Sequence, residues 1–196
     1  FIRANVNPAW GVSPENHDLI ESLHLGTLQK LNAHFSKYPY FLGGKPCIGD
    51  FGMMAPLYGH LGRDPKPLSL MQHHAVRLLR WVERMNRPEP DVGEFANKDP
   101  VYLPKDEVPE TLVEALRHFA TDFVPESRAA CARINQWLTD NPDVRAGTEA
   151  ERHLGLCEFE VRGRTISAMA QPFRFYVLKR VQDELSLIHI SEPTRL

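Results

Sequence analysis

Three groups of residues could do chemistry, judged by their side-chain types and spacing. His73 and His74 are adjacent and could bind a metal ion or act as a general base. Gly43-Gly44-Lys45 is similar to part of a phosphate-binding loop. Cys47 could be a nucleophilic thiol, because it lies at a predicted helix start, where the pKa of a thiol is lowered.

A structural role is nevertheless favoured for each group. Adjacent helical residues diverge by about 100°, and neither His73 nor His74 has an acidic or thiol partner three or four positions away. The glycine pair lacks the full spacing of a phosphate loop. Cys47 stands where a helix N-cap is expected. The sequence therefore predicts no catalytic residue and no metal site in this chain.

The segment 38–51 connects two predicted helices and carries the strongest local signals. Gly43 and Gly44 predict positive φ angles and a tight reversal of the chain. Asp50 lies about three residues inside the helix that begins at Ile48, where a carboxylate accepts hydrogen bonds from free backbone N–H groups. Cys47 and Asp50 are therefore predicted to be structural capping residues.

Apolar periodicity predicts an all-α bundle over residues 13–184 with one short β-hairpin. Residues 1–12 are predicted to be loop, and residues 48–61 to form an apolar helix at the centre of the bundle. Other helices are predicted over 13–37 and from near Pro109, Pro125 and Pro172. A further helix is predicted from an apolar face formed by Met71, Ala75, Leu78, Val82 and Met85. The hairpin is predicted over 157–166.

Composition excludes several classes of protein. The 196 residues have a net charge of −2 with both signs interspersed, so no basic patch predicts binding to nucleic acid or an anionic membrane. No apolar run approaches the roughly 20 residues of a membrane span. Three scattered cysteines form neither a disulfide framework nor a zinc spacing. We expect a cytoplasmic protein.

One stretch resembles a known family. Phe41-Leu42-Gly43-Gly44-Lys45-Pro46, followed by Ile48 and by Asp50-Phe51, resembles the C-terminal helical domain of the glutathione transferase superfamily. The resemblance covers residues 18–87, and residues 106–184 are similar to a bacterial-type branch. In that family the first-turn aspartate pairs with Ser or Thr at the N-cap. Cys47 departs from this pattern, and a thiol is a poor acceptor, so we expect a cap weaker by about 1 kcal/mol.

The resemblance implies a function that this chain would share with another domain. A preceding thioredoxin-like domain would bind and ionise glutathione, the co-substrate. The helical domain would supply one wall of a pocket for a small apolar electrophile and part of a homodimer interface. Trp10, Tyr40 and Tyr58 are candidates for lining that pocket, although aromatic residues at such spacings are more often core. The chain alone is expected to be inactive.

Two other functions fit the same resemblance. The protein could be a non-catalytic, transferase-like module for protein interaction, or a glutathione-dependent reductase or isomerase, because fold alone does not determine function. Residues 185–196 resemble a translated sequencing adapter, and we interpret them as a non-native tail. Residues 1–12 are interpreted as loop from a truncated upstream region.

Overall fold

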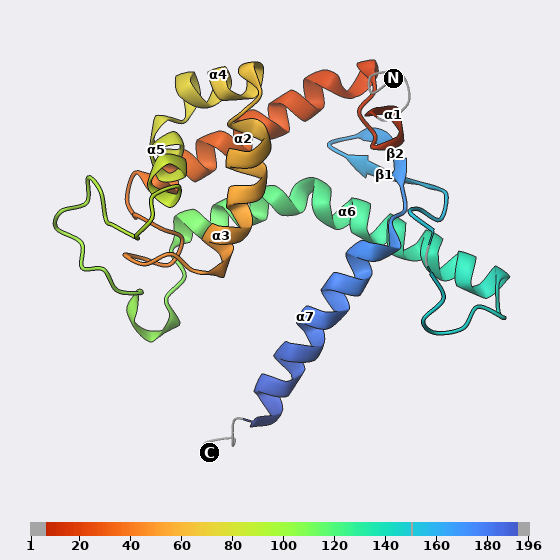
Figure 1. The fold of residues 1–196 in the computed structure, drawn as a ribbon. Helices are drawn as coiled ribbons and strands as arrows, with labels where there is room; N and C mark the ends of the chain where they lie inside the picture. The colour runs from red at the N-terminus through yellow and green to blue at the C-terminus, as the bar shows by residue number, and fades with distance from the viewer. Residues whose placement is uncertain (1–6, 150, 192–196) are drawn as a thin grey trace. The chain divides into compact units, whose positions relative to one another are not determined.

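The computed structural model describes residues 7–149 and 151–191. As predicted, this part of the chain is mostly helical, with one small antiparallel hairpin (Figure 1). The chain divides into two compact units, Asp18–Ala120 and Phe1–His17 together with Thr121–Leu196. We call them the central unit and the hairpin unit. The predictions made for residues 1–6 and 192–196 lie outside the described residues.

The central unit is built from helices around one apolar core. Its elements are α2 (His17–Phe35), α3 (Ile48–Met54), the π-helix η3 (Ala55–Leu61), α4 (Pro65–His74), α5 (Val76–Met85), the short 3₁₀-helix η4 (Pro104–Asp106) and the first part of α6 (Glu110–Asp140). Leu31, Phe35 and Trp81 are fully buried. The rings of Phe35 and Trp81 stack with centroids 4.8 Å apart, so α2 and α5 meet through their aromatic faces.

The expectation that residues 48–61 form the buried centre of the bundle is wrong. Within α3 and η3 the buried residues are Asp50 and Leu57, whereas Ile48 is 91% exposed and Phe51 is 61% exposed. The α-helix also widens into a π-helix at Ala55. Pro56 lacks an N–H and its ring clashes with the preceding turn of an α-helix, and a π-bulge relieves such a conflict.

Two helix boundaries also differ from the prediction. The segment around Met71 and Met85 forms two helices, α4 and α5, separated at Ala75, whose backbone is not helical (φ −147°, ψ 52°). By contrast, α6 continues through Pro125 as one helix of 31 residues. A proline removes one hydrogen bond from such a helix and its ring clashes with the preceding turn, yet this helix continues past Pro125 to Asp140.

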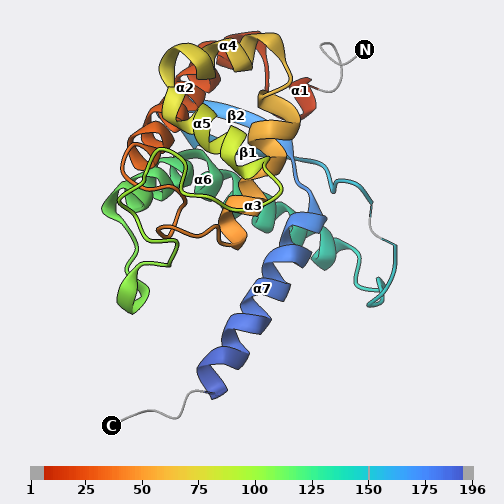
Figure 2. The ribbon, with the colours of Figure 1, turned by 60° about the vertical axis from the view of Figure 1, so that its left-hand side comes forward.

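The hairpin unit contains α1 (Asn7–Ala9), the 3₁₀-helix η2 (Pro14–Asn16), strands β1 (Leu156–Val161) and β2 (Arg164–Met169), α7 (Pro172–Ser191) and the rest of α6. The strands pair in register with Phe159 opposite Ile166. Arg162 and Gly163 have φ angles of 50° and 76°, as a tight two-residue turn requires. Figures 1 and 2 show α7 as one straight blue helix. The short α1 replaces part of the loop predicted over residues 1–12.

The glycine at position 26 tests the packing of the central unit. A Cβ on Gly26 would lie 2.5 Å from the ring of His118, and that ring is held by a 2.9 Å hydrogen bond to the Leu23 carbonyl. We predict that Gly26→Ala lowers stability by about 1–3 kcal/mol. Gly52→Ala is the matched control, because no atom lies within 4 Å of its Cβ position; alanine there should be neutral or stabilising by up to about 1 kcal/mol. Equal thermal melting shifts for the two variants would contradict this packing.

Candidate functional site

The buried carboxylate of Asp50 joins three segments of the central unit. Its oxygens accept hydrogen bonds from the backbone N–H of Cys47 at 2.9 Å, the backbone N–H of Phe41 at 3.2 Å and the indole N–H of Trp81 at 2.9 Å. Asp50 is fully buried. Burial raises the pKa of its carboxyl, and the hydrogen bonds from Cys47, Trp81 and Phe41 oppose that rise.

Cys47 occupies the N-cap of α3. Its backbone is extended, and its sulfur faces the backbone N–H of Asp50 in the reciprocal position of a capping box. Burial raises the pKa of the Cys47 thiol, and a protonated thiol is a poor nucleophile. The geometry therefore favours capping over the alternative of a reactive thiol. Cys47 and Asp50 are thus brought together at one helix start.

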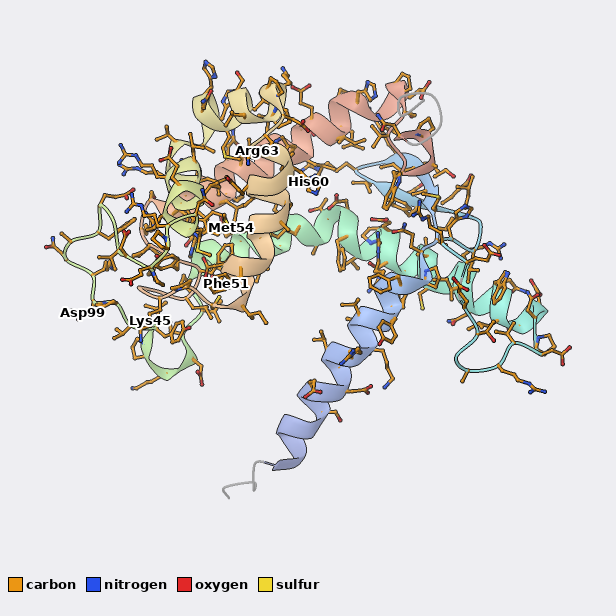
Figure 3. All side chains as sticks on the ribbon, viewed as in Figure 1. Lys45, Phe51, Met54, His60, Arg63 and Asp99 are labelled. Carbon is orange, nitrogen blue, oxygen red and sulfur yellow. The ribbon has the colours of Figure 1, made fainter. Side chains whose placement is uncertain are left out.

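The double glycine before α3 lets two loops approach closely. Gly43 has a φ of 118°, whereas Gly44 lacks the positive φ predicted for it. A Cβ on Gly44 would instead lie 1.9 Å from the Asp99 carbonyl oxygen, and its N–H donates to the Val101 carbonyl at 2.8 Å. Figure 3 labels Lys45 and Asp99 on these two segments. The glycines therefore pack backbone against backbone.

Arg84 links α5 to the connection that follows it. The side chain is buried, its Nη2 donates to the Pro39 carbonyl at 2.7 Å, and its Nη1 pairs with Glu94 at 3.1 Å. Tyr40 anchors the same connection, since its hydroxyl donates to the Asp91 carbonyl at 2.7 Å. The connection over 86–107 is therefore attached to the core at two points.

A small cavity of about 120 Å³ lies beside the start of α3. Its walls come from the loop before α3, from α3, from the end of α5 and from the connection after α5. The lining residues are Tyr40, Pro46, Phe51, Arg84, Met85, Arg87, Pro88 and Pro90. Among these residues, sequence reasoning named only Tyr40 as a pocket candidate. Arg84, Pro88 and Pro90 carried no signal beyond those of a surface helix end and a loop.

Of the three substrate-pocket candidates, Tyr40 lines the cavity beside α3, whereas Trp10 and Tyr58 lie in different units. Trp10 follows α1 in the hairpin unit and is 48% exposed. Tyr58 packs against the core of the central unit, with the Arg63 guanidinium 4.8 Å from its ring centroid. Neither residue lines the cavity beside α3. A wider hollow in the hairpin unit, lined by Gln171, Phe173 and Tyr176 among others, does not include Trp10.

Two histidines of the central unit have local hydrogen-bond partners. His73 Nδ1 lies 2.7 Å from the Ser69 carbonyl one turn earlier. His34 is fully buried between the Thr111 hydroxyl, 2.9 Å from Nδ1, and the Tyr40 carbonyl, 3.2 Å from Nε2. Nε2–H donates to the carbonyl, so Nδ1 accepts from the hydroxyl. Burial lowers the pKa of His34 to about 4.

Over the described ranges, no group of three or more His, Cys, Asp and Glu side chains is arranged to hold a metal ion. None of the helices described is long and apolar enough to cross a membrane. Comparison with protein-family models, with curated proteins and with solved structures found no match.

Substitutions at the start of α3 test the capping geometry. Asp50→Ala leaves the N–H groups of Cys47, Phe41 and Trp81 without their acceptor, and each buried unpaired donor costs about 1–3 kcal/mol. We predict a large loss of thermal stability and of folding yield. Cys47→Ser should instead gain up to about 1 kcal/mol, because a hydroxyl is a better cap acceptor. An Asp50→Ala protein that melts with the parent would refute the assignment.

The buried His34 predicts a pH dependence of stability. Its folded-state pKa of about 4 lies below the ordinary value of about 6.5, so between these values the unfolded chain binds a proton that the folded chain does not. The His34 contribution is complete above about pH 6.5 and is lost as the pH falls towards 4, by up to about 3 kcal/mol. His34→Gln should lessen this dependence in urea unfolding measured from pH 7.5 to 4. Parallel curves for the two proteins would exclude His34 as its source.

Proposed function

We propose that this chain is the C-terminal helical domain of a glutathione transferase-like protein. The observation that supports the proposal best is the position of Asp50. Its carboxylate lies in the first turn of α3 and receives N–H groups from the N-cap residue and from the loop before it. This is the role that the resemblance implies for the aspartate of the Ile48-Gly49-Asp50-Phe51 motif.

The outer face of α3 fits the second part of the proposal. Ile48 and Phe51 are exposed apolar side chains at the start of this helix, and Figure 3 shows Phe51 and Met54 following one another along it. An apolar wall of this kind suits a small electrophile. A thioredoxin-like partner domain would ionise glutathione. The thiolate sulfur would then form a C–S bond to the electrophilic carbon held against the wall as the C–X bond to the leaving group breaks, with chloride expelled from 1-chloro-2,4-dinitrobenzene.

Activity should therefore require the partner domain. We predict that the purified chain conjugates glutathione to 1-chloro-2,4-dinitrobenzene no faster than buffer does. The reading frame upstream of residue 1 should encode a βαβ segment containing Pro-Glu-Ser or Pro-Asp-Ser, and the longer protein should conjugate glutathione. The assay is the formation of the coloured conjugate for both proteins at matched concentration.

Two variants of the longer protein test whether the electrophile binds against the exposed face of α3. Phe51→Ala should raise the KM for the electrophile and leave the KM for glutathione unchanged. Phe173→Ala removes a phenylalanine that is 71% exposed in the hairpin unit and is the control. Conjugation by the chain alone would refute the proposal that a separate domain ionises glutathione. A longer protein without thiol chemistry would favour the interaction module, and reduction or isomerisation without conjugation would favour the other alternative.

A further inference from the structure

We propose that the cavity beside the start of α3 is a binding site for a small, neutral ring compound that carries one carbonyl group. All its lining residues belong to the central unit. The inference does not rest on the proposed function, because it requires neither glutathione nor a second domain.

The volume and the lining residues of the cavity indicate the size and apolar character of the ligand. Its volume is about 120 Å³, and an apolar cavity of about 150 Å³ holds benzene, so a single six-membered ring is of the right size. Tyr40, Phe51, Met85 and the three prolines line the cavity, and their side chains consist largely of carbon. Such a surface favours an apolar ring over a chain of polar groups.

Arg84 indicates which polar group the ligand should carry. This residue lines the cavity and is only 2% exposed. Its two terminal nitrogens are occupied by Glu94 and by the Pro39 carbonyl. Its Nε is buried and has no hydrogen-bond partner among the described residues. A buried donor without an acceptor is unfavourable, and a ligand oxygen in the cavity would supply that acceptor.

The local charges favour a neutral ligand over an anion. The Arg84 guanidinium is paired with Glu94 at 3.1 Å, and that of Arg87 with Asp91 at 2.5 Å. Burial raises the pKa of the Tyr40 hydroxyl, and the negative charges of Asp91 and Asp50 add to that rise. The two positive charges are therefore already balanced, and a carboxylate ligand would lose its hydration without gaining an unpaired cation. A carbonyl oxygen accepts the Nε–H without bringing a charge.

Two nearly isosteric probes isolate the carbonyl. Cyclohexanone and methylenecyclohexane differ in one group, an oxygen acceptor against a methylene. Each is titrated into the ¹⁵N-labelled chain, and amide and indole shifts are followed by NMR. Cyclohexanone should bind about tenfold more tightly, which corresponds to about 1.4 kcal/mol. The amide shifts should cluster at residues 40, 51, 84–87 and 89, together with the Trp81 indole.

Matched variants test the location. Phe51→Ala removes a partly exposed wall and should weaken cyclohexanone binding several-fold, whereas Phe173→Ala in the hairpin unit should leave it unchanged. Equal affinity for the two probes would show an apolar hollow in which the Arg84 nitrogen takes no part. Absence of saturable binding would show a water-filled hollow only, and an unchanged affinity in Phe51→Ala would place the site elsewhere. Each of these three results overturns the proposal.

Discussion

The buried carboxylate of Asp50 is the interaction on which the central unit depends. A charge away from water is tolerated only when donors replace its hydration, and here the donors come from the loop before α3, from the N-cap and from α5. The bond to the Trp81 indole places α5 against the start of α3. Arg84, three residues further along α5, then reaches the Pro39 carbonyl. One carboxylate thus positions the polar contacts around it.

A second set of polar contacts uses neutral groups. His34 connects α2 to the Tyr40 carbonyl and to Thr111 in α6, and the Tyr40 hydroxyl binds the backbone of Asp91. Buried polar groups need hydrogen-bond partners that match them. The Asp50 carboxylate is surrounded by N–H donors, whereas the neutral His34 ring has one donor and one acceptor as partners. These contacts also position Tyr40, one of the residues that line the cavity beside α3.

Local sequence signals predicted the features that depend on neighbouring residues. The alternation from Cys157 to Val161 and the Arg162-Gly163 turn predicted the hairpin, and Asp50 was predicted as a first-turn acceptor. Features that depend on distant contacts were not predicted. The exposure of Phe51 depends on which helix faces have a partner, which apolar periodicity does not specify. Arg84 was missed because arginine is usually exposed, and its partners lie 45 and 10 residues away.

Native-state hydrogen exchange tests the central claim most directly. If the Asp50 carboxylate holds the loop and the helix start together, the backbone amides of Phe41 and Cys47 and the indole N–H of Trp81 should exchange only when the central unit unfolds. Their free energies of opening should equal that of the slowest core amides in α2. Exchange of Phe41 and Cys47 at the rate of exposed loop amides, with the α2 core still protected, would contradict the account.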